Sequence, residues 1–417
     1  HESISGSQNW NYIPSDNIRI YGDYAMEDAG FPGSGTKNNP FRISGLLISS
    51  LTIGILIQSV SYHFVIEDCI ITSPTHIWDS HVGIILQDSI HASVINTTIS
   101  WKEDGIYIDN CYGAIIENNT IENSWGTGIR ASSADGASIL SNSITKTTSD
   151  GISATYSDDV DIVSNSISYC KGIPIYCHDC PQSAIKQNVI SNSKQGIHLR
   201  YADDLTIIGN QMDQGGVFND WLSLYSSLTL NNNTVGGQPI GYFADEQEPR
   251  LDAIDYGQII LFNCSKVIIS GGYFRNVSCG VSAQWCRDSS ISNITSQGTS
   301  RYGLSLRSCT NVTVGDCILT NSSSANIYIA DGWNCRVRDS ILEGGEDGIY
   351  STSNGCTVTN CAISGHENIG AELWGEGTNI TGNLFMDNHN GGLTMSIDRY
   401  DENMTHVMNN QFLNDGL

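Results

Sequence analysis

The feature that most constrains this chain is a repeat of about 22 residues that runs through most of its length. In each repeat a glycine opens a short apolar triplet, as in GIYI at Gly105 and GIRA at Gly128. After one longer first step the spacing in the first half is nearly constant, at Gly54, Gly83, Gly105, Gly128, Gly151, Gly172 and Gly196. The same spacing resumes in the second half, at Gly257, Gly280, Gly303, Asn326, Gly348, Gly370 and Gly392.

The segments between the turns alternate with period two and favour Ile and Val, so they are predicted to be strands. Leucine-rich repeats have a similar period, but they need a leucine-asparagine consensus that this chain lacks. A parallel β-helix remains, in which short strands stack coil upon coil about 4.8 Å apart. We therefore predict an all-β fold, a parallel β-helix (β-solenoid) of about fourteen coils of about 22–23 residues in two seven-coil halves.

Interruptions of the repeat predict four parts. Residues 1–44 are irregular and aromatic and are predicted to cap the first coil, whereas residues 45–210 form the first half. Residues 211–256 break the repeat and form an irregular connection, and residues 257–417 form the second half. Asn recurs at the turn after each triplet, where it can bond along a ladder of side-chain amides and tolerates left-handed angles. The glycines are expected where φ must be positive.

The charge balance bears on partners and location. The chain has 19 basic and 44 acidic residues, a net charge of −25 that disfavours nucleic acid and anionic lipid. It begins at His1 without an initiator Met, which we interpret as removal of a signal peptide. The longest apolar stretch, GLLISSLTIGILI, is shorter than a membrane-spanning helix requires. We expect an extracellular protein of the cell surface, without membrane insertion.

Two segments resemble known proteins. GSGTKNNPFRISG (33–45) is similar to a motif of archaeal surface proteins built from parallel β-helix repeats. NNNTVGGQPIGYF and DAIDYGQIILFNC, both within 231–264, resemble a motif of the same NosD-like group. The resemblance implies the β-helix fold. The group includes a copper-site maturation factor for nitrous oxide reductase and many cell-surface proteins of methanogens. A compact, cysteine-rich member is also similar to what would build the sheath of some methanogens.

The chain has 13 cysteines, an odd number, so at least one is free or bonded to another molecule. Most follow the repeat and are predicted to form an interior ladder of stacked thiols. The members of this ladder are Cys111, Cys264, Cys286, Cys309, Cys335 and Cys356. Four that fit the repeat less well are candidates for disulfides between subunits: Cys170, Cys177, Cys180 and Cys279.

No constellation typical of catalysis stands out in the sequence. Acidic pairs at Asp158–Asp159 and Asp203–Asp204 lack a basic companion and are interpreted as solvated turns. His63 and His91 could lie on adjacent coils, with His76 and His81 in the loop between them, and could form a metal site. No cofactor is predicted for any residue, and the protein is expected not to be an enzyme.

Ten N-x-S/T sequons are candidates for N-glycosylation, although an Asn/Ser/Thr-rich repeat also generates them by composition. They are at Asn96, Asn118, Asn232, Asn263, Asn276, Asn293, Asn311, Asn321, Asn379 and Asn403.

The ends of a β-helix tend to associate with other strands, since the last coil exposes unpaired backbone groups and an apolar cross-section. The sequence finishes a coil at THVMNNQFLNDGL. We therefore predict a secreted structural protein that polymerises with itself, by strand stacking and by intermolecular disulfides, into a sheath or surface layer. A carbohydrate-binding or carbohydrate-cleaving protein is the first alternative, because exposed aromatic residues could stack on sugars. The residues considered for this are Trp78, Trp101, Trp125, Trp285, Trp333 and Trp374. A copper-handling periplasmic protein is the second alternative.

Overall fold

Each repeat of the sequence is one coil of a parallel β-helix, built from three short strands with sharp corners between them. One such coil contains β10 (Thr98–Ser100), β11 (Ile106–Asp109) and β12 (Ile115–Glu117). This computed structural model describes residues 12–75, 81–201, 203–220, 227–395 and 405–416. It has about fifteen coils, so the predicted fold class is confirmed.

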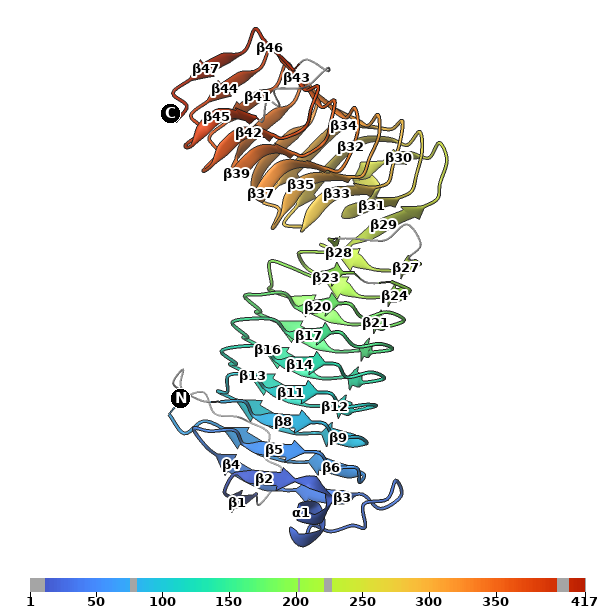
Figure 1. Ribbon diagram of the computed structural model, residues 1–417, viewed down its shortest axis with the longest axis vertical. Coiled ribbons are helices and arrows are strands. Elements are labelled where there is room, and N and C mark those ends of the chain that lie inside the picture. The colour runs from blue at the N-terminus through green and yellow to red at the C-terminus, as the bar shows by residue number, and fades with distance from the viewer. Residues whose placement is uncertain (1–11, 76–80, 202, 221–226, 396–404, 417) are drawn as a thin grey trace. The chain divides into compact units, whose positions relative to one another are not determined.

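The coils form two compact units whose boundary is interleaved between residues 193 and 230. In the first unit each strand pairs in parallel with the equivalent strand of the next coil, and Figure 1 shows these strands as successive rungs from blue to green. The first sheet contains β1 (Ile13–Ser15), β4 (Leu46–Ser49), β7 (Ile70–Thr72), β10, β13 (Thr120–Glu122), β16 (Ser143–Thr145), β19 (Ser166–Ser168) and β22 (Val189–Ser191).

Two further sheets complete the coils of this unit. The second sheet contains β2 (Ile18–Tyr21), β5 (Ile55–Gln58), β8 (Ile84–Gln87), β11, β14 (Ile129–Ser132), β17 (Ile152–Thr155), β20 (Ile175–His178) and β23 (Ile197–Arg200). The third contains β3 (Phe41–Ser44), β6 (Phe64–Glu67), β9 (Ala92–Ile95), β12, β15 (Ser138–Leu140), β18 (Asp161–Val163), β21 (Ala184–Lys186) and β24 (Leu205–Ile208). Helix α1 (Gly22–Asp28) follows β2 and buries Met26.

The short strands near the boundary between the units are β25 (Gln211–Met212), β26 (Val217–Asn219), β27 (Leu228–Asn231) and β28 (Thr234–Val235). The second unit continues with β29 (Gln238–Ala244), β30 (Arg250–Asp252), the 3-10 helix η1 (Ala253–Asp255), β31 (Gln258–Phe262), β32 (Ile268–Arg275), β33 (Cys279–Gln284), β34 (Ser290–Gln297), β35 (Tyr302–Arg307), β36 (Thr313–Gly315) and β37 (Ile318–Ala330). It ends with β38 (Arg336–Arg338), β39 (Ile341–Ser351), β40 (Thr357–Thr359), β41 (Ala362–Ser364), β42 (Ile369–Leu373), β43 (Asn379–Thr381), β44 (Leu384–Met386), β45 (Gly391–Met395), β46 (His406–Met408) and β47 (Gln411–Leu413).

The core consists of columns of aliphatic side chains stacked along the solenoid axis. Because side chains alternate along a strand, the first and third residues of β11, Ile106 and Ile108, point inward while Tyr107 and Asp109 point outward. One column, fully or almost fully buried, contains Ile84, Ile106, Ile129, Ile152, Ile175 and Ile197. Burying such a side chain stabilises the fold by about 2 kcal/mol, and one coil alone has no apolar neighbour to cover it.

The asparagine ladder is present, but its conformation differs from the prediction. Asn142 Nδ2 donates to Asn165 Oδ1 at 3.0 Å, and Asn142 Oδ1 accepts from the backbone N–H of Asn119 at 2.9 Å. These ladder residues are buried, and the left-handed backbone belongs to the residue before each of them, as at Asn118 with φ 55°. The turn therefore exposes one polar residue and buries the next.

The repeat glycines are needed for space rather than for positive φ. A Cβ atom on Gly105 would lie 2.5 Å from the carbonyl oxygen of Gly128 on the next coil and 2.6 Å from Ile121 Cγ2. Gly105 does not have a positive φ. Close approach of backbones between coils is thus the reason for glycine here, and the expectation of left-handed angles at this position is wrong.

The two irregular parts predicted from the sequence contain regular strands. Within 1–44, β1, β2 and β3 pair with β4, β5 and β6, so strands of the first coil already lie in this segment. Within 211–256, β28 and β29 pair antiparallel, and β29 then pairs in parallel with β31.

Candidate functional site

Polar and aromatic side chains form a line across the outer face of the second sheet in the first unit. The strand register places these residues directly beside one another on five successive coils. We name them the polar row: Tyr107, Arg130, Ser153, Tyr176 and His198. With a strand spacing of about 4.8 Å, the row is about 19 Å long.

Arg130 is held in place at one end of the row. Its Nη2 lies 3.1 Å from Asp104 Oδ2, and its guanidinium lies 5.8 Å from the centre of the Tyr107 ring. Asp104 also accepts a hydrogen bond from the backbone N–H of Thr127 at 2.6 Å. Burial raises the pKa of the Asp104 carboxyl, and the Thr127 and Arg130 contacts oppose that shift. Asp104 thus orients a guanidinium whose side chain is 46% exposed.

Asp150 occupies the position equivalent to Asp104 two coils further along. Its Oδ1 accepts the backbone N–H of Ile173 at 2.7 Å, the same kind of contact that Asp104 makes with Thr127. Burial raises the pKa of Asp150, and the hydrogen bond from Ile173 and the charge of Arg130 offset part of this shift. No ion pair comparable to that of Asp104 and Arg130 joins Asp150 to a cation in the described residues. Asp150 therefore retains a proton to higher pH than an ordinary aspartate.

A histidine–carboxylate pair lies at the other end of the row. His198 Nε2 lies 2.7 Å from Asp220 Oδ2, and the imidazole is 6% exposed. The neighbouring Tyr176 has a raised pKa, first because of burial, while Asp220 and Asp150 add to the shift and a hydrogen bond with Arg200 opposes it. A carboxylate on one imidazole nitrogen fixes the orientation of the ring, which is the arrangement used for proton transfer by histidine.

Sequence reasoning missed this cluster because its members each lie one repeat from the next and form no local motif. One sequence signal could have revealed the cluster. The second residue after the repeat glycine is Tyr107, Arg130 or His198 in different coils. The acidic pairs considered instead are in corner turns: Asp159 and Asp204 both have left-handed backbone angles.

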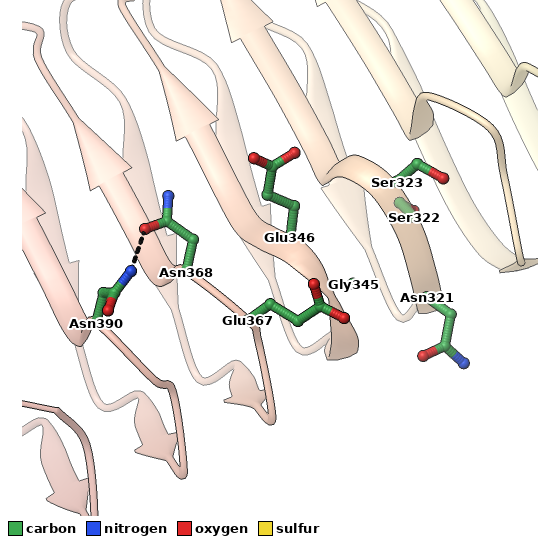
Figure 2. A pocket seen from close by; sticks show the side chains of 8 residues that line it. All are labelled: Asn321, Ser322, Ser323, Gly345, Glu346, Glu367, Asn368 and Asn390. Atoms are coloured by element: carbon green, nitrogen blue, oxygen red, sulfur yellow. Dashed lines mark hydrogen bonds between the residues drawn. The ribbon is translucent and has the colours of Figure 1, made fainter.

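The second unit has a surface hollow of about 820 Å³ with a polar lining. Figure 2 shows Glu346 and Glu367 projecting from neighbouring coils, with Asn390 donating a hydrogen bond of 2.9 Å to Asn368. Beside this hollow Tyr302, Tyr328 and Tyr350 stack with ring centres 4.5 Å and 5.6 Å apart. Those tyrosines line a smaller hollow that shares Glu346.

The histidine metal site considered as an alternative in the sequence does not fit the arrangement of its residues. The rings of His63 and His91 are parallel within 7°, with centres 4.0 Å apart. A metal ion lies in the plane of each imidazole that binds it, and two parallel planes share no such point. His76 lies outside the described residues, and among those that are described no group of three or more His, Cys, Asp or Glu is suited to hold a metal. His63 and His91 therefore form a ring stack.

The predicted cysteine ladder divides into separate columns. Cys264, Cys286 and Cys309 lie on three successive coils. The N–H of Arg287, the residue after Cys286, donates to the carbonyl of Cys264, and the N–H of Thr310, the residue after Cys309, donates to the carbonyl of Cys286. Cys335 and Cys356 belong to a neighbouring column that contains Val312 one coil earlier, and Cys111 lies in the first unit between Ser89 and Ala134.

The candidates for intermolecular disulfides are buried as well. Cys170 is 5% exposed, and Cys177, Cys180 and Cys279 are at most 1% exposed. A bond to another molecule would require local opening of these coils, and it stays a prediction.

Most of the sequon asparagines lie at exposed corners. Eight have left-handed backbone angles: Asn96, Asn118, Asn232, Asn263, Asn276, Asn293, Asn311 and Asn321. All of these are exposed except the half-buried Asn311, and Asn379 is half-buried on β43. Asn403 lies outside the described residues, and glycosylation of any of them stays a prediction.

Two protein-family models match separate parts of the chain. Residues 82–235 match a family described as a right-handed beta helix region. Residues 250–416 match the periplasmic copper-binding protein family NosD. A search of curated proteins finds no match. The matches support a NosD-like parallel β-helix repeat, and each of them covers less than half of the chain. No helix among the described residues is long and apolar enough to cross a membrane.

Several solved structures share the fold at low identity. The A-module of a mannuronan C-5 epimerase from Azotobacter vinelandii is 11% identical, with a TM-score of 0.29 over 93% of this chain and 92% of that one. The catalytic domain of an α-1,3-glucanase in complex with tetrasaccharides is 11% identical, with a TM-score of 0.28 over 96% and 68%. A mutant tailspike protein of E. coli bacteriophage HK620 in complex with pentasaccharide is 9% identical, with a TM-score of 0.36 over 96% and 70%.

These structures correct one expectation from the sequence. The sequence leads to the expectation that the protein is not an enzyme. This expectation is wrong, because proteins named as an epimerase and a glucanase occur among its structural neighbours. The fold is not specific to catalysis, so whether this chain acts on a substrate depends on its own side chains.

Proposed function

We propose that this protein binds an extended polysaccharide along the polar row and performs acid–base chemistry on it. The observation that carries the proposal is the alignment of Tyr107, Arg130, Tyr176 and His198 across five coils. The buried carboxyl of Asp104 and the half-buried carboxyl of Asp150 border this row. A linear polymer lying along the axis would meet a new side chain about every 4.8 Å. Aromatic rings and a guanidinium are side chains well suited to contact sugar rings and hydroxyl groups.

The proposed roles follow from the environments of the groups. Asp150 is the proton donor to the departing sugar oxygen, because burial raises the pKa of its carboxyl. The His198–Asp220 pair accepts the proton of the attacking water. Two coils separate Asp150 from His198 along the axis, about 10 Å, which leaves room for a sugar ring and a water molecule. Arg130, positioned by Asp104, binds the substrate beside this centre.

The test combines a binding screen with an activity assay on the full chain. Neutral glucans and uronic-acid polymers are compared by affinity electrophoresis, and cleavage is followed by new reducing ends. Asp150→Asn should retain binding and lose at least about 100-fold in cleavage, as expected for removal of a general acid. Asp158→Asn, the same substitution at an exposed turn, is the matched control. Binding to none of the polymers, or equal cleavage by both variants, would refute the proposal.

Self-assembly into a sheath or surface layer is the second candidate function, favoured by one observation in the second unit. On β46 and β47 the side chains of Val407, Met408, Phe412 and Leu413 are 46% to 52% exposed. Phe412 stacks on the buried Phe385 at 4.9 Å, so the apolar column of the core continues to the surface here. We propose that this apolar edge is covered by a second copy of the chain.

The assembly proposal is tested by sedimentation and electron microscopy of the purified chain. Phe412→Lys should abolish polymers, whereas Tyr112→Lys, a change at a 65% exposed aromatic of the first unit, should leave them intact. Monomers of the unaltered chain at all concentrations would exclude the second copy as the occupant. Addition of reductant to the same samples tests the predicted intermolecular disulfides.

A further inference from the structure

Three thiols of the second unit lie in one interior column on successive coils. The backbone N–H of Arg287 donates to Cys264 O at 3.0 Å, and that of Thr310 donates to Cys286 O at 2.9 Å. The next N–H, of Trp333, donates to Cys309 O at 2.9 Å. These ladder bonds align Cys264, Cys286 and Cys309 along the axis, and all three are at most 1% exposed.

The three thiols follow one another along this column, and each donates to a carbonyl oxygen two residues earlier. Cys264 Sγ lies 3.3 Å from Phe262 O, Cys286 Sγ lies 3.4 Å from Gln284 O, and Cys309 Sγ lies 3.3 Å from Arg307 O. Neighbouring coils stand about 4.8 Å apart, within the Cα separation of about 4.4–6.8 Å that a disulfide spans. Cys286 therefore has a bonding partner on each side, whereas Cys264 and Cys309 are two coils, about 10 Å, from each other.

The other cysteines of the described residues are placed differently. Cys177 and Cys180 belong to the same coil, so a bond between them would join no two coils. Cys335 and Cys356 lie on successive coils of one column, but their other column neighbours are Val312 and Thr378. Among the described residues, Cys286 is thus the cysteine that has another cysteine on the coil before it and on the coil after it.

We propose that Cys286 forms a disulfide with one of its two column neighbours when the protein matures in an oxidising compartment. The oxidant is a disulfide of a small thiol or of an oxidoreductase, written RSSR. A thiolate of the pair attacks RSSR and releases one RS⁻, and the second thiolate attacks the mixed disulfide and releases the other. One protein S–S bond forms, the two cysteines lose two electrons and two protons, and RSSR becomes two RSH.

The spare third thiol gives this column a further property. When Cys286 is bonded to Cys264, the thiolate of Cys309 can attack the Cys286 sulfur and release Cys264, which moves the bond by one coil without net oxidation. All three cysteines are at most 1% exposed, so an oxidant or external thiol does not reach them in the folded state. The bond consequently forms while the coils are still open and is retained once they close.

The experiment maps thiols in the full chain, secreted from an oxidising compartment and purified without reductant. Free thiols are alkylated in denaturant, and the digested peptides are identified by mass spectrometry. The expected result is a crosslink between the Cys286 peptide and that of Cys264 or Cys309, with the third cysteine alkylated. Alkylation of all three, a crosslink between Cys264 and Cys309, or a crosslink of any of the three to a cysteine outside this column would overturn the proposal.

Two variants keep the test decisive. Cys286→Ser should leave both Cys264 and Cys309 alkylated, because two coils separate them, whereas Cys111→Ser should leave the crosslink unchanged. If Cys286→Ser does not fold, Cys264→Ser should give a Cys286–Cys309 crosslink, and its absence would count against the proposal. These outcomes are independent of polysaccharide binding, which is measured on the first unit.

Discussion

Lys102 is a lysine with no exposed surface, and its charge should make stability depend on pH in a defined way. It lies in an interior corner column, and its Nζ donates to Ser50 O and, at 2.9 Å, to Thr52 O. Burial is the main cause that lowers the pKa of Lys102 to about 8 from an ordinary 10.5, and Arg19 contributes to the shift.

The sign of the pH dependence of stability follows from proton binding by Lys102 in the folded and unfolded states. Below about pH 8 both the folded and the unfolded chain hold the proton, so the cost of burying the charge is constant. Between about 8 and 10.5 the folded state has released the proton while the unfolded state retains it, so stability rises with pH. A pKa lowered from 10.5 to about 8 corresponds to about 3 kcal/mol.

The assay is urea unfolding of the unaltered chain and of Lys102→Met, followed by tryptophan fluorescence from about pH 7 to 11. Trp101 and Trp125, whose rings are 5.6 Å apart, lie beside this corner. The difference in unfolding free energy between the two proteins should change by about 3 kcal/mol in favour of the unaltered chain as pH rises. Lys171→Met, at an exposed lysine, should show no such change. Parallel pH profiles for Lys102→Met and the unaltered chain would refute the reasoning.

Three further changes test the fold and the thiol column. Asn142→Ala removes the side-chain hydrogen bonds to Asn119, Ile116 and Asn165 on the two neighbouring coils and should destabilise the unit by about 3 kcal/mol. The exposed Asn118→Ala should cost less than about 1 kcal/mol in the same thermal unfolding measurement, and similar losses for the two variants would argue against the ladder. Gly105→Ala places a Cβ 2.5 Å from the Gly128 carbonyl and should cost about 2 kcal/mol in urea unfolding, so an unchanged midpoint would contradict the close packing. Reduction of a Cys286 disulfide, which closes a loop of about 22 residues, should cost about 3 kcal/mol in the oxidised protein and nothing in Cys286→Ser.

The fold was largely predictable from the sequence because its determinants are local and repeated. An inward isoleucine at every second position of a strand and a corner after each short strand are visible within a single repeat. Stacking then follows, since one coil cannot cover its own apolar face. The reason for the glycines was not predictable, because a Cβ on Gly105 collides with Gly128, which becomes its neighbour only when the coils stack.

The candidate site was not predictable for the same reason. Arg130 and His198 are three repeats apart in sequence, and only the register of β14, β17, β20 and β23 places them on one line. The cysteine ladder shows the same limit: the spacing of Cys309 and Cys335 suggested one column, whereas the strand register assigns them to two.

The parallel β-helix could be read from the sequence alone, because periodic burial of Ile and Val in short strands is encoded within each repeat. The stacking of the coils alone determines which outward side chains become neighbours and which thiols lie in one column. Those contacts depend on the register between coils about 4.8 Å apart, and a shift of one residue reverses which face a side chain occupies.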